Sequence, residues 1–407
     1  MPDRDEPEAH EPQPAESAAP ADEIAAPVLP SSPRFTLREI FFGPDGLRAG
    51  WSLLLYIVLL AALITGDGYL INPPRHKPAV TQTNSAAPPN ASAQPKPQPS
   101  KPSVPAPPML LPAKALLLGD GTALLSVLIA TWLMGKIERR PTSVFGLGGT
   151  HRLRNFLSGL AWGVALLTLL VFTLRACGLL VFDARQIFGA SALRFGAVWL
   201  SGFLLVGLFE ETFFRGYLQF TLARGINGIF DWLRSFAVHA TEYSASGCNQ
   251  TAPRASGLRA TGQSAPGFWT AALLLSFGFG FTHRSNPGES PIGLVAAALI
   301  AVVFCLSLWR TGSLWWAIGF HAAWDWAQSF LYGVADSGLI IRGHLFSTHP
   351  VGRPILSGGL TGPEGSFFIL PIVGLTAAVI VLTLPRVHHD DPSASANTRA
   401  TAGLDLP

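Results

Sequence analysis

The chain has 407 residues, of which 49% are hydrophobic and only 13% are charged. Soluble domains carry about 25% charged residues, so this balance favours a protein embedded in lipid. The net charge is only +3, and the basic residues stand in short clusters beside apolar runs. That pattern is typical of membrane topology and argues against a phosphate-binding face, so we do not expect a nucleic-acid partner.

The first 48 residues predict a disordered acidic tail rich in Pro and Ala, followed by a juxtamembrane segment. The tail has no apolar stretch, so it is not a signal peptide and has too little to bury to fold alone. The scattered cysteines form no Cys-x-x-Cys pair, which predicts neither a disulfide framework nor a thiolate metal site. They are Cys177, Cys248 and Cys305.

A membrane-spanning helix needs about 20 predominantly apolar residues. Eight stretches approach or reach that length, so we expect an all-α, polytopic membrane protein with about eight transmembrane helices. A Pro-rich, flexible loop (67–113) follows the first span, a multi-span membrane domain covers 114–385, and a polar insert (239–267) interrupts it before a disordered tail (386–407). The expected spans are 49–66, 115–135, 156–181, 195–223, 268–283, 292–309, 313–333 and 367–384.

Lys and Arg in short loops mark the cytoplasmic side of a membrane protein. They cluster before the first span and again after the second, so both regions are expected to be cytoplasmic. Eight crossings then place both termini inside, in a bacterial inner membrane. The clustered residues are Arg34, Arg38 and Arg48, then Lys136, Arg139, Arg140, Arg152 and Arg154.

Three charges stand within six residues of the fourth span, where each costs at least about 2.5–3.5 kcal/mol at the bilayer centre. Glu211 and Arg215 are four residues apart, so they lie on one helix face and can pair. Glu210 is rotated by about 100° from Glu211 and lacks that partner. A carboxylate without a counter-charge in an apolar setting suits a general acid or base.

Two further spans carry polar groups at matching depth. His283 ends the fifth span, while His321 and Asp325 lie four residues apart in the seventh. A rise of about 1.5 Å per residue puts Glu210, His283 and His321 roughly 12–22 Å from the cytoplasmic surface. These groups can therefore meet in one layer as a single hydrolytic site.

Structural explanations exist for each residue alone. A transmembrane His is often an interhelical hydrogen-bonding residue, and His283 could mark a helix end. The Glu211–Arg215 pair is expected to support the site rather than react. Two other charged residues are given no catalytic role. Asp120 is assigned to the mouth of a helix, and Arg175 is expected to snorkel, with its charged group directed toward the membrane surface. The combination on three helices is hard to explain by packing.

These motifs resemble those of the CPBP family of intramembrane proteases, which includes the eukaryotic CAAX prenyl endopeptidases and bacterial relatives linked to bacteriocin processing, immunity or abortive infection. The series Glu-Glu-x-x-x-Arg, Phe-x-x-x-His and His-x-x-x-Asn/Asp occurs here in that order. The resemblance covers about 195–333. Its motifs begin at Glu210, Phe279 and His321.

The resemblance implies a multi-span helical fold and hydrolysis of a peptide bond in a membrane-associated protein or peptide. Glu210 would be the general base for a water molecule, assisted by His283. His321 and Asp325 would stabilise the oxyanion, and Glu211 with Arg215 would brace the site.

Asp325 stands where the family motif also admits Asn. An ionised Asp cannot donate a hydrogen bond, so Asp325 must be protonated, orient His321 through its other ring nitrogen, or ligate a metal. The resemblance covers both metalloproteases and metal-free glutamate proteases. If a metal is used, Glu210, His283 and His321 could hold Zn²⁺ with an open water position, and Glu211 could then be the base. We favour the metal-free mechanism.

Two other functions compete with proteolysis. Intramembrane carboxylates and histidines also build proton relays, as in a proton-coupled transporter. The sequence lacks the repeat and the paired, broken helices typical of many carriers. The second alternative is a non-catalytic membrane immunity or scaffold protein that keeps the same residues.

Overall fold

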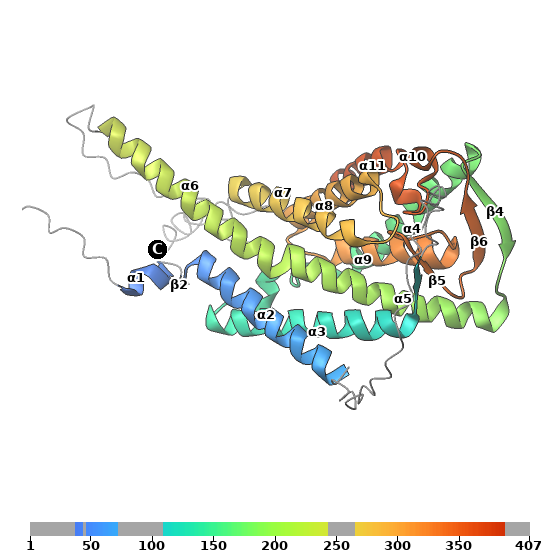
Figure 1. Cartoon of the computed structure of the whole chain (residues 1–407). Coiled ribbons are helices and arrows are strands. Elements are labelled where there is room, and N and C mark those ends of the chain that lie inside the picture. Colours follow the sequence, from blue (N-terminus) through green and yellow to red (C-terminus); the bar gives the residue numbers. More distant parts are fainter. Residues whose placement is uncertain (1–36, 44–45, 72–108, 243–264, 387–407) are drawn as a thin grey trace, which may run out of the picture.

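The computed structural model of the protein describes residues 37–43, 46–71, 109–242 and 265–386. Most of these residues are helical and form one elongated bundle (Figure 1). The helices are α1 (Leu37–Phe41), α2 (Ala49–Ile71), α3 (Ala113–Ile137), α4 (Arg152–Ala176), α5 (Gly189–Glu211), α6 (Gln219–Glu242), α7 (Ala265–Thr282), α8 (Pro291–Thr311), α9 (Trp315–Trp326), α10 (Pro354–Ser357) and α11 (Ile369–Thr383).

Strands make only short two-stranded ladders in the described part of the chain. The pairs β1 with β2 and β4 with β6 are antiparallel, whereas β3 pairs with β5 in parallel. The β4–β6 ribbon closes the end of the bundle opposite the α3–α4 connection (Figure 1). The strands are β1 (Phe42–Gly43), β2 (Gly46–Leu47), β3 (Met109–Leu111), β4 (Leu180–Arg185), β5 (Leu339–Ile341) and β6 (Phe346–Pro350).

The expected all-helical membrane fold is confirmed, but the count of eight spans is not. Six helical stretches in the described residues are long and apolar enough to cross a bilayer. In the seventh expected span, α9 and the π-helical turn that follows it are shorter than a full crossing. The eighth, α11, is also short. Both lie against other helices, so fewer residues suffice there than in a helix surrounded by lipid.

The fourth expected span is one long helix with a kink. Helix α5 continues through the π-helical turn η2 (Thr212–Leu218) into α6. Gly216 has φ −84° and ψ −112°, which leaves the helical region and bends the chain there. Such π-turns are frequent at functional sites. This one directly follows Glu210 and Glu211.

Several expected boundaries differ from those in the structure. Helix α2 runs to Ile71 instead of residue 66, and α3 starts at Ala113. Within the expected tail and loop, α1, β1, β2 and β3 are formed. The remainder of the predicted disordered tails and flexible loop (1–36, 72–108 and 387–407) lies outside the described residues, as do most of the polar insert (243–264) and Cys248.

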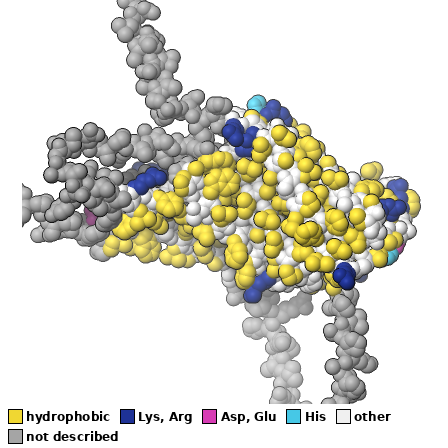
Figure 2. Space-filling model, turned by 90° about the horizontal axis from the view of Figure 1, so that it is seen from above, with side chains coloured by type: hydrophobic (Ala, Val, Ile, Leu, Met, Phe, Trp, Pro, Cys, Tyr) yellow, Lys and Arg dark blue, Asp and Glu magenta, His cyan; other side chains and the backbone are white. Residues whose placement is uncertain are grey.

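The surface of the bundle is apolar along its length. Figure 2 shows hydrophobic side chains covering most of one face, with Lys and Arg mainly toward its margins. Large apolar side chains point outward from several helices, among them Ile57, Trp132, Phe172 and Phe277. In water such a surface would be unfavourable, whereas in hydrocarbon it is the expected exterior.

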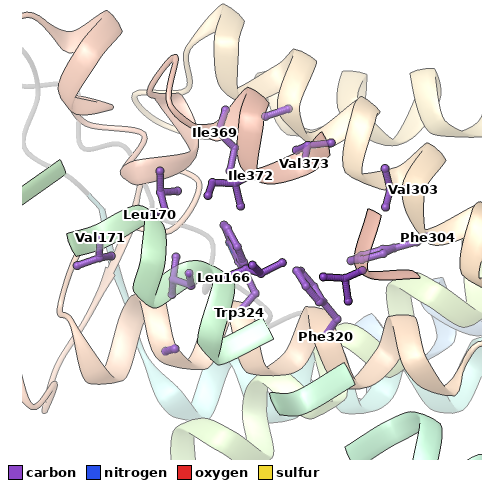
Figure 3. Close-up of a cluster of buried hydrophobic side chains, with 14 of the residues drawn as sticks. Leu166, Leu170, Val171, Val303, Phe304, Phe320, Trp324, Ile369, Ile372 and Val373 are labelled. Carbon is purple, nitrogen blue, oxygen red and sulfur yellow. The ribbon is translucent and has the colours of Figure 1, made fainter. Parts of the chain in front are cut away.

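The main buried cluster joins α4, α8, α9 and α11 (Figure 3). In that view Trp324 of α9 lies near side chains of α4 and α11, and Phe320 lies between Trp324 and Phe304 of α8. Contact between α4 and α9 is closest where both helices carry glycine. A Cβ atom at Gly159 would stand 2.1 Å from the carbonyl oxygen of Trp316, and one at Gly319 would stand 2.2 Å from that of Phe156. The two backbones therefore touch, which fixes the height and rotation of α9.

We predict that Gly159→Ala destabilises the protein although Ala is the better helix former. The added methyl group collides with backbone that cannot move without shifting α9, and overpacking costs about 1–3 kcal/mol. Gly374→Ala is the matched control, because a Cβ there meets no atom within 4 Å and should be neutral or stabilising. Thermal unfolding in detergent measures both, and equal melting temperatures would contradict this packing argument.

Candidate active site

The centre of the candidate site is a buried ion pair on the kinked helix. Nη1 of Arg215 lies 3.2 Å from Oε1 of Glu211, and both side chains are almost completely buried. Their spacing of four residues produces the pair, as expected from the sequence. The guanidinium of Arg215 also lies over the ring of Phe279, 4.4 Å from its centroid. A cation enclosed by aromatic faces and a carboxylate is held in one position.

His321 connects this pair to α9. Its Nδ1 lies 3.0 Å from Oε1 of Glu211, the same oxygen that Arg215 contacts. A carboxylate oxygen paired with a guanidinium acts as an acceptor. Nδ1 of His321 therefore carries a hydrogen and donates a hydrogen bond to Glu211. Glu211 thus fixes both the orientation and the tautomer of the His321 ring.

The other ring nitrogen of His321 faces two carboxyl groups. Nε2 lies 3.6 Å from Oε2 of Glu210 and 3.5 Å from Oδ2 of Asp325. These contacts attract only if a proton resides on Nε2 or on one of the two carboxyls. Asp325 therefore contacts His321 at Nε2, while Glu211 contacts it at Nδ1, because α5 and α9 pack side by side there.

His283 ends α7 in the short 3₁₀ turn η3 (His283–Ser285). Its Nδ1 lies 2.9 Å from the carbonyl oxygen of Phe279. A carbonyl oxygen can only accept, so Nδ1 is the protonated nitrogen and Nε2 of the neutral ring keeps a free lone pair. The ring of Phe279 contacts both His283, with centroids 4.8 Å apart, and the guanidinium of Arg215.

One cavity of about 340 Å³ brings these groups together. Glu210, His283, His321 and Asp325 all line it, whereas Glu211 and Arg215 lie behind its wall. Apolar side chains of α3, α5, α8, α9 and α11 form much of the remaining surface. A largely apolar cavity with a few convergent polar groups is the usual form of a substrate site.

Sequence reasoning missed three acidic residues of the cavity. Asp120 of α3 was assigned to a helix mouth, but it lines the cavity together with Asp336 and Glu364. Asp120 could have been found, because it is a charge within an apolar span. The other two lie in the connection between α9 and α11, which has no periodic pattern. Arg175, as expected, stays away from the site and lies over the ring of Phe182.

The two acids of the connection are held in place by side chains near the site. Glu364 accepts a hydrogen bond of 2.7 Å from Nε1 of Trp324, and Asp336 accepts one of 3.2 Å from the hydroxyl of Ser329. Burial, with the carboxylates of Asp325 and Glu364 nearby, raises the pKa of Asp336 well above its ordinary value. This wall of the cavity therefore disfavours additional negative charge.

The described residues do not fit a metal ion in this arrangement. They contain no group of three or more His, Cys, Asp or Glu side chains arranged to hold one. Of the predicted Zn²⁺ ligands Glu210, His283 and His321, only the first and last are in contact. A protein zinc site needs at least three ligands at about 2.0–2.3 Å. We therefore derive no step through a metal.

Residues 192–327 match the family of Rce1-like type II CAAX prenyl endopeptidases. This segment is a CAAX protease domain. The match runs from α5 to the first residue of the π-helical turn η4 (Ala327–Leu331), and so includes all three motifs. It covers about a third of the chain, and the helices α2, α3, α4 and α11 lie outside it. No curated protein and no solved structure gives a significant match.

Removal of the buried cation should destabilise the CAAX protease domain. In Arg215→Ala, Glu211 loses the guanidinium and remains buried, which typically costs about 3–5 kcal/mol. Arg234→Ala is the matched control, because Arg234 pairs with Asp231 at 3.6 Å on the exposed surface and should change stability by less than about 1 kcal/mol. Denaturant titration in detergent measures both. A stable but inactive Arg215→Ala protein would instead give this arginine a direct catalytic role.

Proposed function

We propose that the protein is an intramembrane endopeptidase of the CAAX type, which hydrolyses a peptide bond of a membrane-associated protein or peptide. The observation that carries this proposal is the single cavity that Glu210, His283 and His321 share within a CAAX protease domain. Much of the cavity wall is apolar, so each charge in it acts more strongly than it would in solution.

In this mechanism Glu210 takes a proton from the attacking water molecule. Its side chain lines the cavity, and its Oε2 has no hydrogen-bond partner within the described residues, so the carboxylate can accept a proton there. Nε2 of His283 offers a second acceptor on the same cavity wall. Together they can hold a water molecule and remove its proton as it attacks the carbonyl carbon.

His321 and Asp325 face the developing oxyanion. A proton shared between Nε2 of His321 and the nearby carboxyls can be donated to the carbonyl oxygen as negative charge develops there. Glu211 keeps the ring in the required orientation through Nδ1, and Arg215 holds the side chain of Glu211 in place. This assignment makes Glu211 and Arg215 supporting residues rather than groups that touch the substrate.

We further propose a location in a bacterial inner membrane with both termini in the cytoplasm. The support is the basic α3–α4 connection at one end of the bundle and the β4–β6 ribbon at the other (Figure 1). In a variant without native cysteines, a cysteine at Arg139 should react with an impermeant maleimide only after the membrane is opened. One at Thr348 of β6 should react in intact cells. The reverse pattern would invert the topology.

The function is tested with protein reconstituted in liposomes and assayed for cleavage of a prenylated C-terminal peptide and of an unprenylated membrane-anchored peptide. Glu210→Gln keeps the size of the side chain but cannot accept the proton, so turnover should fall by about 10²–10⁴-fold. Asp183→Asn, on the exposed β4 strand, is the control and should be fully active. Absence of cleavage by the folded wild type on both substrates would favour a non-catalytic scaffold.

Asp325→Asn separates the two mechanisms. Without a metal, an amide at this position donates a hydrogen bond without being protonated, so activity should persist and extend to higher pH. If Asp325 instead supports a metal site, activity or metal affinity should fall by about 10–100-fold. The measurement is a pH–rate profile of both proteins with chelator and with added Zn²⁺. Loss of activity that excess zinc restores would refute the metal-free mechanism.

A further inference from the structure

A second buried charged cluster lies beside the kinked helix, on the C-terminal side of Arg215. Glu138 follows α3 and is almost completely buried. Its Oε1 accepts hydrogen bonds of 3.0 Å from the hydroxyl of Tyr217 and 3.0 Å from Nη2 of Arg224. Arg224 also contacts the carbonyl oxygen of Leu47 and the hydroxyl of Ser52. The cluster thereby joins α3, α6 and the start of α2.

This cluster is poorly explained as a source of stability. Glu138 is the C-cap of α3, where a helix dipole disfavours negative charge. Its second oxygen, Oε2, has no hydrogen bond within the described residues and lies 3.9 Å from Nε of Arg140. Replacing a buried ion pair by apolar residues is often neutral or stabilising. The arrangement therefore suggests that the cluster serves to hold the residues that it joins in fixed positions.

The place of Tyr217 in the chain indicates which part of the structure the cluster holds in position. It stands two residues after Arg215, and Gly216 between them has the non-helical ψ of −112°. The helical hydrogen-bond ladder is disturbed at this point, so it does not fix the angle between the two residues. Side-chain contacts must do so instead. The ring of Tyr217 packs on Tyr56 at 4.5 Å and on Phe145 at 5.1 Å, while its hydroxyl is held by Glu138.

We propose that Glu138 and Tyr217 are positioning residues for the site, and that α2 and α3 set the geometry of the CAAX protease domain through them. The path runs from Glu138 to Tyr217, across Gly216 to Arg215, and from there to Glu211 and His321. Each step is a contact or a covalent neighbour. Residues outside 192–327 would thus decide how precisely Glu210 and His321 face each other. This proposal rests on the proposed function for its catalytic readout only.

The experiment compares Tyr217→Phe with Tyr56→Phe. Each substitution removes one hydroxyl group from one of two adjacent stacked rings in the same apolar cluster. The hydroxyl of Tyr56, however, is hydrogen-bonded to Thr131 and not to Glu138. A displacement of about 1 Å in a catalytic group can reduce turnover by about 10²-fold. We expect kcat of Tyr217→Phe to fall by about tenfold or more with KM unchanged, whereas Tyr56→Phe keeps the wild-type kcat. Glu138→Met keeps the length of the side chain but removes both acceptor oxygens, so it should lower kcat as Tyr217→Phe does, and the double variant should be no worse than Glu138→Met alone.

Cys305 supplies a readout that needs no activity. This thiol is buried and lies near Arg215 and Ser276. In a background in which Cys177 and Cys248 are replaced by Ser, its rate of maleimide labelling reports access to the Arg215 region. Tyr217→Phe should raise that rate several-fold and Tyr56→Phe should not. Equal labelling and equal kcat in the two variants would overturn the proposal. Faster labelling of Tyr217→Phe in a protein without peptidase activity would uphold it and reject only the proposed function.

Discussion

The structure depends on one buried contact, in which a single carboxylate oxygen of Glu211 serves both Arg215 and His321. Each of these three groups would be costly alone in an apolar interior. Together they join the kinked helix to α9 and give the imidazole a defined orientation. The remaining features follow from that constraint. The glycine faces of α4 and α9 bring His321 to the required height, and the π-helical turn places Arg215 behind Glu211.

The sequence predicted the helical membrane fold and the ion pair of Glu211 with Arg215, but not the contacts between helices. A charge in an apolar span is so unfavourable that Glu210, Glu211 and Arg215 could be selected without any structural information. Their spacing predicted the ion pair correctly. Which carboxylate would contact which nitrogen of His321 depends on the rotation of α9 against α5, and no pattern within a single helix contains that angle.

The polar wall of the cavity was beyond sequence reasoning for a different reason. Asp336 and Glu364 lie in a long connection in which backbone turns, rather than periodic side chains, decide the path. Several glycines there have positive φ, among them Gly338, Gly358 and Gly362. A Cβ atom at Gly338 or Gly362 would also stand within 2 Å of a backbone carbonyl oxygen. Glycine is needed at such positions for both reasons, but its presence alone does not tell which side chains the turn will bring together.

Helix α9 is enclosed by other helices, and most of its side chains are buried. Together with the π-helical turn η4 it is about 25 Å long, shorter than the hydrocarbon core of about 30 Å. A helix that meets little lipid is not required to match the thickness of the bilayer. Thicker or thinner membranes therefore act on the outer helices, which adapt by tilting. The position of His321 relative to Glu211 is set instead by the packing of α9 against α4 and α5, so the geometry of the candidate site should change little with the lipid composition around it.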